Sequence, residues 1–180
     1  MLSTLRNAWK VPELRKRFLW TIFLVAIFRI GIHIPVPGID TSALSTLTES
    51  GGLLSFYNLI SGGAFTKASI LALSVSPYIN ASIIMQLLTI AIPSLEQLSK
   101  EGEEGRKKIQ SITRYVSIGI ACVLALGVYS TIANLGATSG VGTPEKIVII
   151  FSLVVGSTFC MWLGDQITQK GFGNGVSILI

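Results

Sequence analysis

Apolar and polar residues follow one another along this chain in long blocks. Four blocks rich in aliphatic and aromatic residues are separated by polar connections, and a fifth block opens at residue 176. Each complete block has 17 to 23 residues, and an α-helix of that length crosses the roughly 30 Å hydrocarbon core of a bilayer. We predict an all-α integral membrane protein, a multi-span helical bundle of about four transmembrane helices plus the start of a fifth. The predicted spans are 18–34, 70–92, 115–135, 147–164 and 176–180.

The second block carries more polar side chains than a lipid-facing helix tolerates. Residues 68–95 run 28 positions without a formal charge, yet seven polar residues and Pro77 interrupt the stretch between positions 74 and 89. Polar groups at membrane depth are costly unless they face protein or water. We predict that Ser76 caps a helix whose first residue is Pro77, with non-helical backbone before it. A membrane tolerates such backbone only where protein or a water-filled cavity covers it. The polar residues are Ser74, Ser76, Tyr78, Asn80, Ser82, Gln86 and Thr89.

The connection between the first two spans, residues 35–69, is long for a compact protein. It opens with the rigid turn IPVPGID, because proline fixes its own φ and disfavours helix in the residue before it. Its apolar part, residues 53–60, is too short to span a bilayer and is followed by Gly62 and Gly63. The pattern leaves two interpretations open: a short re-entrant helix tucked into the protein, or an interfacial cap over the helix ends.

Charged residues are scarce and gather at the ends of the predicted spans. Only 13% of the chain is charged, about half the usual share of a soluble domain, and the mean hydropathy is +0.67. The net charge of +5 could suggest nucleic acid as a partner, but this layout argues against sequence-specific binding to it. Eleven Lys and Arg residues fall on one side of the membrane and two on the other, which places the N-terminus in the cytoplasm.

This orientation assigns each connection to a side of the membrane. Residues 1–17 form a cytoplasmic amphipathic N-terminus, and the connections 93–114 and 165–175 are cytoplasmic loops. Residues 136–146 form an outer loop. Arg29 lies inside the first span near its outer end, where it either reaches the interface or pairs with a carboxylate or backbone carbonyls of another helix.

Residues that could carry out catalysis do not form a recognisable pattern. His33 has no nearby carboxylate or cysteine set, so we expect no metal site and no cofactor. Nothing in the Ser, Thr and Asp spacing resembles a nucleophile elbow or a triad, so we expect that the protein is not an enzyme. On a helix from Ser76, however, Ile79, Ile83 and Gln86 lie near one face. An aliphatic constriction beside polar walls can gate a pore by dewetting, although helix–helix packing is the alternative.

Four segments carry a specific resemblance to a known family. They are FRIGIHIPVPGID at 28–40, FYNLISGGAFTKASILALSVSPYINASIIMQLL at 56–88, KEGEEGRKK at 100–108 and MWLGDQITQKGFGNGVSILI at 161–180. In order and spacing they closely resemble the SecY family, the channel subunits of the bacterial protein-conducting translocon. The resemblance covers nearly the whole chain, which looks like most of the N-terminal half of such a channel. It implies passage of unfolded secretory proteins and lateral release of membrane segments into the bilayer.

The resemblance also implies roles for individual residues. The family's pore ring matches Val75, Ile79 and Ile180, and its lateral gate, where a signal sequence binds, matches Ile83, Ile84 and Leu87. The family's plug, a short helix that closes the outer funnel, matches residues 56–69 and favours the re-entrant interpretation of that segment. The plug residues that we expect to matter are Phe56, Leu59, Ile60, Gly62, Gly63 and Phe65.

The same resemblance implies partners and a location. We expect the SecE and SecG subunits, the SecA motor ATPase, a ribosome with its nascent chain, signal peptides and preproteins, all in the lipid bilayer of the bacterial plasma (inner) membrane. A solute transporter with broken helices around a midplane site is the alternative from another class. Such a transporter needs ionisable or substrate-reading groups near the membrane centre. Spans two to four, as drawn, contain no charge, which favours a neutral pore.

Overall fold

The computed structural model describes residues 11–39, 41, 44–45, 53–134 and 142–180. Helices are the regular elements of this part of the chain, with one isolated antiparallel bridge between Pro35 and Ser69. The predicted all-α class is therefore confirmed. The helices are α2 Pro12–Gly31, α4 Leu53–Ile60, α5 Ser76–Ala91, α6 Pro93–Lys100, α7 Glu103–Asn134, α8 Thr143–Lys170 and α9 Gly175–Leu179.

Two of the described helices, α7 and α8, are each long and apolar enough to cross a bilayer. The pair α5 and α6 counts as a third crossing only if both are taken together, and they are bent by 101° at Ile92. Helix α2 is not apolar over a long enough stretch to count as a third such helix. Its first turns hold four charged residues, and the apolar part that follows is helical only over residues 18–31. The first span was predicted over 18–34, but its helix ends at Gly31, three residues before the predicted end and ahead of Pro35 and Pro37.

The two long helices extend well beyond the predicted spans. Helix α7 begins twelve residues before the predicted span, with Glu103 and Glu104 in a first turn that favours acidic side chains. Helix α8 begins at Thr143, where the Gly142 amide donates a hydrogen bond of 2.9 Å to Oε2 of Glu145, and ends with Lys170 in its last turn. The predicted loops 93–114 and 165–175 are therefore largely helical, because polar residues with good helix propensity continue a helix past its apolar part.

The predicted N-terminal and outer segments lie only partly within the described residues. Residues 1–10 of the predicted N-terminus, parts of the 35–69 connection and residues 136–141 of the outer loop fall outside them. The described end of the N-terminal segment belongs to α2, which starts with Pro12 and Glu13, a pair suited to a first helical turn. Residues 12–17 of the predicted N-terminal segment and residues 18–31 of the predicted first span thus form one continuous helix.

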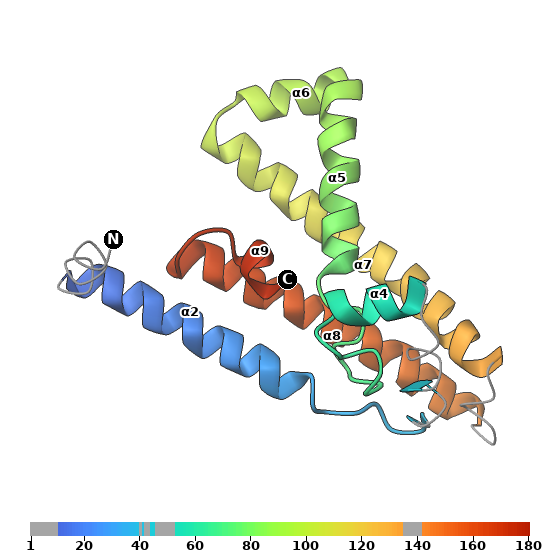
Figure 1. Ribbon diagram of the computed structural model, residues 1–180. Helices are drawn as coiled ribbons and strands as arrows, with labels where there is room; N and C mark the ends of the chain where they lie inside the picture. Colours follow the sequence, from blue (N-terminus) through green and yellow to red (C-terminus); the bar gives the residue numbers. More distant parts are fainter. Residues whose placement is uncertain (1–10, 40, 42–43, 46–52, 135–141) are drawn as a thin grey trace.

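The helices form two packed groups. Figure 1 shows α2 running alongside α8, with α9 folded back onto α8, whereas α5, α6 and α7 form a second group that packs on α8 mainly through α7. In the second group the α6–α7 corner is tight, because a Cβ on Gly105 would overlap the backbone carbonyl of Leu98. Helices α7 and α8 converge toward the end of α7 and the start of α8 and spread apart toward their other ends (Figure 1).

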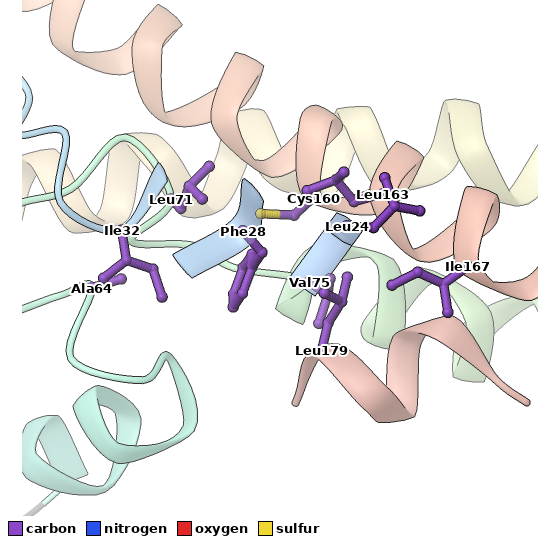
Figure 2. Packing of buried hydrophobic residues seen from close by; sticks show 10 residues of the cluster. All are labelled: Leu24, Phe28, Ile32, Ala64, Leu71, Val75, Cys160, Leu163, Ile167 and Leu179. Atoms are coloured by element: carbon purple, nitrogen blue, oxygen red, sulfur yellow. The ribbon is translucent and has the colours of Figure 1, made fainter. Parts of the chain in front are cut away.

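The largest buried cluster joins the first group to the irregular segment that precedes α5. Its members come from α2, α8, α9 and residues 64–75, and Figure 2 shows them gathered between these elements. Helix α8 lies against the irregular segment at Gly156, where an added Cβ would overlap the backbone carbonyl oxygen of Ile70. The cluster consists of Leu24, Phe28, Ile32, Ala64, Leu71, Val75, Cys160, Leu163, Ile167 and Leu179.

This close approach gives a stability prediction. We expect Gly156→Ala to lower the thermal stability of the purified protein, at a cost of about 1–3 kcal/mol, because overpacking forces α8 away from the Ile70 carbonyl. The matched control is Gly119→Ala on α7, where an added Cβ meets nothing within 4 Å. Thermal unfolding in detergent measures both variants. Equal melting temperatures for the two alanine variants would contradict the packing described here.

Candidate functional site

The backbone of residues 61–75 is irregular, and its polar groups are bonded to neighbouring elements. Ser69 Oγ donates to the Gly31 carbonyl at 3.0 Å, and Ser157 Oγ of α8 donates to the Ser74 carbonyl at 3.2 Å. The amides of Val36 and Ile70 donate across the Pro35–Ser69 bridge, at 2.8 Å and 3.1 Å. As predicted, protein covers the non-helical backbone that precedes the second helix.

Helix α5 begins one residue earlier than the sequence predicted. Its N-cap is Val75, whose carbonyl accepts the Ile79 amide at 3.1 Å, and no side chain caps the helix. The prediction that Ser76 caps the helix is therefore wrong. Ser74 has a φ of 50°, so the backbone turns before Val75 and the helix starts there. Pro77 still fits, because the first four amides of a helix lack intrahelical partners.

A cavity of about 380 Å³ lies between the start of α5 and the ends of α7, α8 and α9. Three predicted site residues line it: Ile79 and Ile83 from α5, and Ile180 after α9. Three of the six predicted ring and gate residues therefore lie around one cavity, although they come from segments about a hundred residues apart in the sequence. Most of the remaining lining is polar and comprises Tyr78, Ser82, Gln86, Gln110, Asp165, Thr168, Asn174 and Ser177, with Val176 as the other apolar member.

A second, larger space shares part of its lining with this cavity. It has a volume of about 780 Å³ and lies between α5, α6 and α7. Hydroxyl and amide side chains again make up much of its lining, including Thr89, Ser99 and Thr113. Tyr78, Ser82, Gln86 and Gln110 line both spaces. The α5 face that carries these residues therefore borders both spaces, whose walls mix polar and apolar side chains.

Val75, the third predicted ring residue, does not line the cavity. It is 1% exposed and packs in the large cluster, where Figure 2 shows it beside Leu179. Ile79 packs against the same cluster from outside. In this chain Val75 is therefore a core residue at the turn into α5, and Tyr78 and Ile79 are the first α5 side chains at the cavity wall.

The three predicted gate residues lie on an exposed aliphatic surface of α5. Ile83, Ile84 and Leu87 are all exposed, and Ile83 alone among them also lines the cavity. Ala81 and Met85, which face α7 and α8, are buried instead. The gate residues are therefore available to another apolar segment.

The predicted plug divides into two parts. Helix α4 spans eight residues, starts before the predicted boundary, and leaves Phe56 and Leu59 65% and 77% exposed. Gly62 and Gly63 follow with φ of 66° and 85°, conformations that favour glycine. Residues 64–69 are then turns, with Phe65 buried beside Leu44, Ala68 and Ile132. The side chain of Ile60 lies outside the described part. Helix α4, with its exposed Phe56 and Leu59, thus leads through a glycine hinge at Gly62 and Gly63 to the buried Phe65.

Arg29 contacts this hinge. Its side chain is exposed at the end of α2, and Nη1 donates to the Gly62 carbonyl at 3.4 Å. The structure combines parts of both interpretations of Arg29, because the side chain is exposed at the helix end and its backbone partner belongs to a turn, not to another helix. His33 Nδ1 lies 2.9 Å from the Arg29 carbonyl, and within the described residues no three His, Cys, Asp or Glu side chains gather as a metal site would require.

An ion pair that the sequence analysis missed borders the cavity. Arg114 Nη2 lies 2.7 Å from Oδ2 of Asp165, whose side chain is only 8% exposed, and Gln110 Nε2 lies 3.4 Å from Oδ1. Both charges fall one residue outside the spans drawn from the sequence, but inside α7 and α8. The view that the walls are free of charge was therefore wrong. The position of Asp165, directly after the apolar run of α8, was the available signal.

Comparisons with known proteins agree with this architecture. The sequence model of the SecY family matches residues 69–180. The protein translocase subunit SecY of Escherichia coli K12 is 44% identical over 174 residues, which cover 93% of this chain and 39% of that protein. The SecY subunit of Pseudomonas aeruginosa PAO1 is 45% identical over 181 residues, covering 99% of this chain and 41% of that protein. The chain thus spans about two fifths of the length of these curated relatives.

Solved channel structures share the fold. "The structure of a protein conducting channel" aligns with a TM-score of 0.63 at 21% identity, over 92% of this chain and 35% of that one. The Sec61 channel of a canine ribosome–channel complex gives a TM-score of 0.62 at 21% identity, over 92% of this chain and 35% of that one. The family match covers more than half of the chain, and together with the broken second span and the helical architecture it shows that this multi-pass membrane protein belongs to the SecY family.

Proposed function

We propose that this chain forms part of the central channel of a Sec translocon, which passes unfolded secretory proteins across the membrane and releases membrane segments sideways. The protein is a channel component and not an enzyme. The observation that carries the proposal is the cavity of about 380 Å³ where Ile79 and Ile180 meet beside hydroxyl and amide side chains. Membership of the SecY family, whose curated members are named translocase subunits, gives this cavity its interpretation.

The chemistry of the lining suits passage of many different sequences. Aliphatic side chains make no specific hydrogen bonds, so Ile79 and Ile180 can contact any passing polypeptide without selecting its sequence. When no polypeptide is present, a narrow aliphatic ring denies hydrated ions a polar path. We propose that Ile79 and Ile180 belong to this ring. Val75 supports it from behind as part of the core, since it is buried beneath the start of α5.

The neighbouring segments suit two further roles. We propose that α4 and residues 61–69 act as the plug, with Gly62 and Gly63 as its hinge. The exposed helix and the buried Phe65 support this division into a movable part and an anchor. We further propose that Ile83, Ile84 and Leu87 form this chain's side of the lateral gate, since an apolar signal sequence would cover their exposed surface.

Orientation and partners follow from the charge pattern and the family. We propose a multi-pass protein of the bacterial plasma membrane with its N-terminus in the cytoplasm, supported by the excess of Lys and Arg at one set of helix ends. The proposed partners are SecE, SecG, the SecA motor ATPase, the ribosome and the signal peptides of preproteins. The canine structure is titled as a ribosome–channel complex, which supports the ribosome among them.

The bonds that Asp165 makes within the protein argue against the transporter alternative. This carboxylate borders the cavity, as a solute-binding group would, but Arg114 and Gln110 of α7 already bond both of its oxygens. Its charge is paired within the protein. A transporter would need this group, or another ionisable one, free to bind its substrate.

Photocrosslinking tests the proposed channel directly. With a photoreactive residue at Ile79 and a stalled secretory precursor engaged in the full-length channel, we expect an adduct between Ile79 and the precursor. The matched control is Val123, an exposed apolar position of α7 that lines neither hollow, and it should give no precursor adduct. Crosslinks from Ile79 to neighbouring helices alone would make it a packing residue and restore the transporter alternative.

Ion leakage tests the seal. We expect Ile79→Ser to raise the resting ion conductance of the full-length channel several-fold, because a hydroxyl in the constriction stabilises water there. Ile147→Ser on α8 makes the same chemical change at an exposed site away from the cavity and should leave the conductance unchanged. Conductance of reconstituted bilayers measures both. A resting leak in Ile79→Ser equal to that of the parent channel would argue against a ring at this residue.

A further inference from the structure

The two helix groups meet along α7 and α8, and the character of this contact changes along its length. Near the outer connection the contact is apolar, with Ala125 of α7 packed in one cluster with Ile149 and Leu153 of α8. Farther along, Ser117 of α7 donates a hydrogen bond of 3.1 Å to the sulfur of Met161. Beyond that point, where the two helices spread apart (Figure 1), the contact is made by Gln110, Arg114 and Asp165.

These three residues form a bridge of fixed geometry. Gln110 and Arg114 are four residues apart, so they share one face of α7. Each bonds a different oxygen of Asp165, at 3.4 Å and 2.7 Å, so both oxygens of the carboxylate are held from the same helix. Within the described residues, this is the one ion pair that joins two helices, since Lys100 and Glu96 pair inside α6.

The bridge borders the cavity. Gln110 and Asp165 line it together with Ile79 and Ile180. Ile79 belongs to α5, which packs on α7, whereas Ile180 follows α9, which packs on α8. Because Gln110 and Asp165 both line the cavity, a change in the separation of α7 and α8 at the bridge would move the wall at Gln110 relative to the wall at Asp165.

We propose that Arg114, Gln110 and Asp165 are positioning residues that set the width of the cavity by tying the α5–α7 group to the α8–α9 group. This inference rests on the proposed channel function for its consequence, but the tie itself can be measured separately. Loss of one partner leaves the other charge poorly solvated, which is far more costly than loss of both. Removing either charge should therefore let the two groups separate, and restoring a pair should bring them back together.

Spin labels can measure this separation in the full-length channel in lipid nanodiscs. We place labels at Lys107 and Lys170, exposed positions near the diverging ends of α7 and α8, after replacing Cys122 and Cys160 by alanine. In Asp165→Asn and in Arg114→Gln we expect the distance distribution to lengthen and the population of the wider state to rise about tenfold, as an interaction worth about 1.4 kcal/mol would give. The exchanged variant Arg114→Asp/Asp165→Arg should return toward the parent distribution.

Two controls separate this role from a general loss of stability. Glu96→Gln breaks the exposed pair inside α6 and should leave the distances unchanged. If the single variants fail to assemble, Arg114→Ala/Asp165→Ala removes both charges without leaving one unpaired and without adding a large apolar side chain that could replace the contact, and it too should populate the wider state. Distances in that double variant equal to those of the parent would overturn the proposal, as would single variants that match Glu96→Gln.

The outcome is independent of the proposed function. Widened distances together with no precursor adduct at Ile79 would support the proposal that the bridge holds the two helix groups together, and would contradict the proposed channel function. An adduct at Ile79 together with unchanged distances would support the proposed channel function, and would contradict the proposal that the bridge holds the two helix groups together. If both hold, the resting conductance of Asp165→Asn should exceed that of the parent, and that of Asp165→Glu, which keeps the carboxylate, should fall between them.

Discussion

The structure depends on one requirement: every backbone N–H and C=O at membrane depth needs a partner. The second span does not meet it with a continuous helix, because Ala68 and Ser74 adopt positive φ and residues 61–75 form turns. The bonds come from elsewhere, through Ser69 to Gly31 and from Ser157 to Ser74. This explains why α2 and α8 pack tightly on the irregular segment and why Gly156 has no room for a side chain. The irregular segment is thus the centre of the fold.

Starting α5 partway through the span has a direct consequence for the cavity. A short helix that begins at depth presents Ile79 and its polar neighbours to the space left by the missing turns. The backbone before it holds Val75 in the core, so the wall on which Ile79 stands is rigid. The polar bridge at Asp165 then fixes the opposite wall relative to the first. Rigid walls with an aliphatic narrowing suit a conduit that must close against ions and yet accept varied polypeptides.

Much of this could be predicted from local sequence. Apolar blocks gave the helical class, and Pro77 with the polar residues around it gave the break in the second span. The helix ends could not be predicted from hydropathy, because α7 and α8 continue through charged residues that are good helix formers. Burial of Val75 and the pairing of Arg114 with Asp165 depend on contacts between residues far apart in the chain, which no local pattern reports. The same holds for the Arg29 contact with Gly62.

The central claim is that α5 borders a water-filled hollow at membrane depth. Cysteine accessibility along α5 in the full-length channel tests it most directly, with Ser82→Cys at the hollow and Ala81→Cys, at a position that is 0% exposed and lines neither space, in the core. A membrane-impermeant thiol reagent should modify Ser82→Cys much faster than Ala81→Cys, and an arrested precursor should protect Ser82→Cys from it. Equal, slow modification of both positions, unaffected by a precursor, would contradict the account.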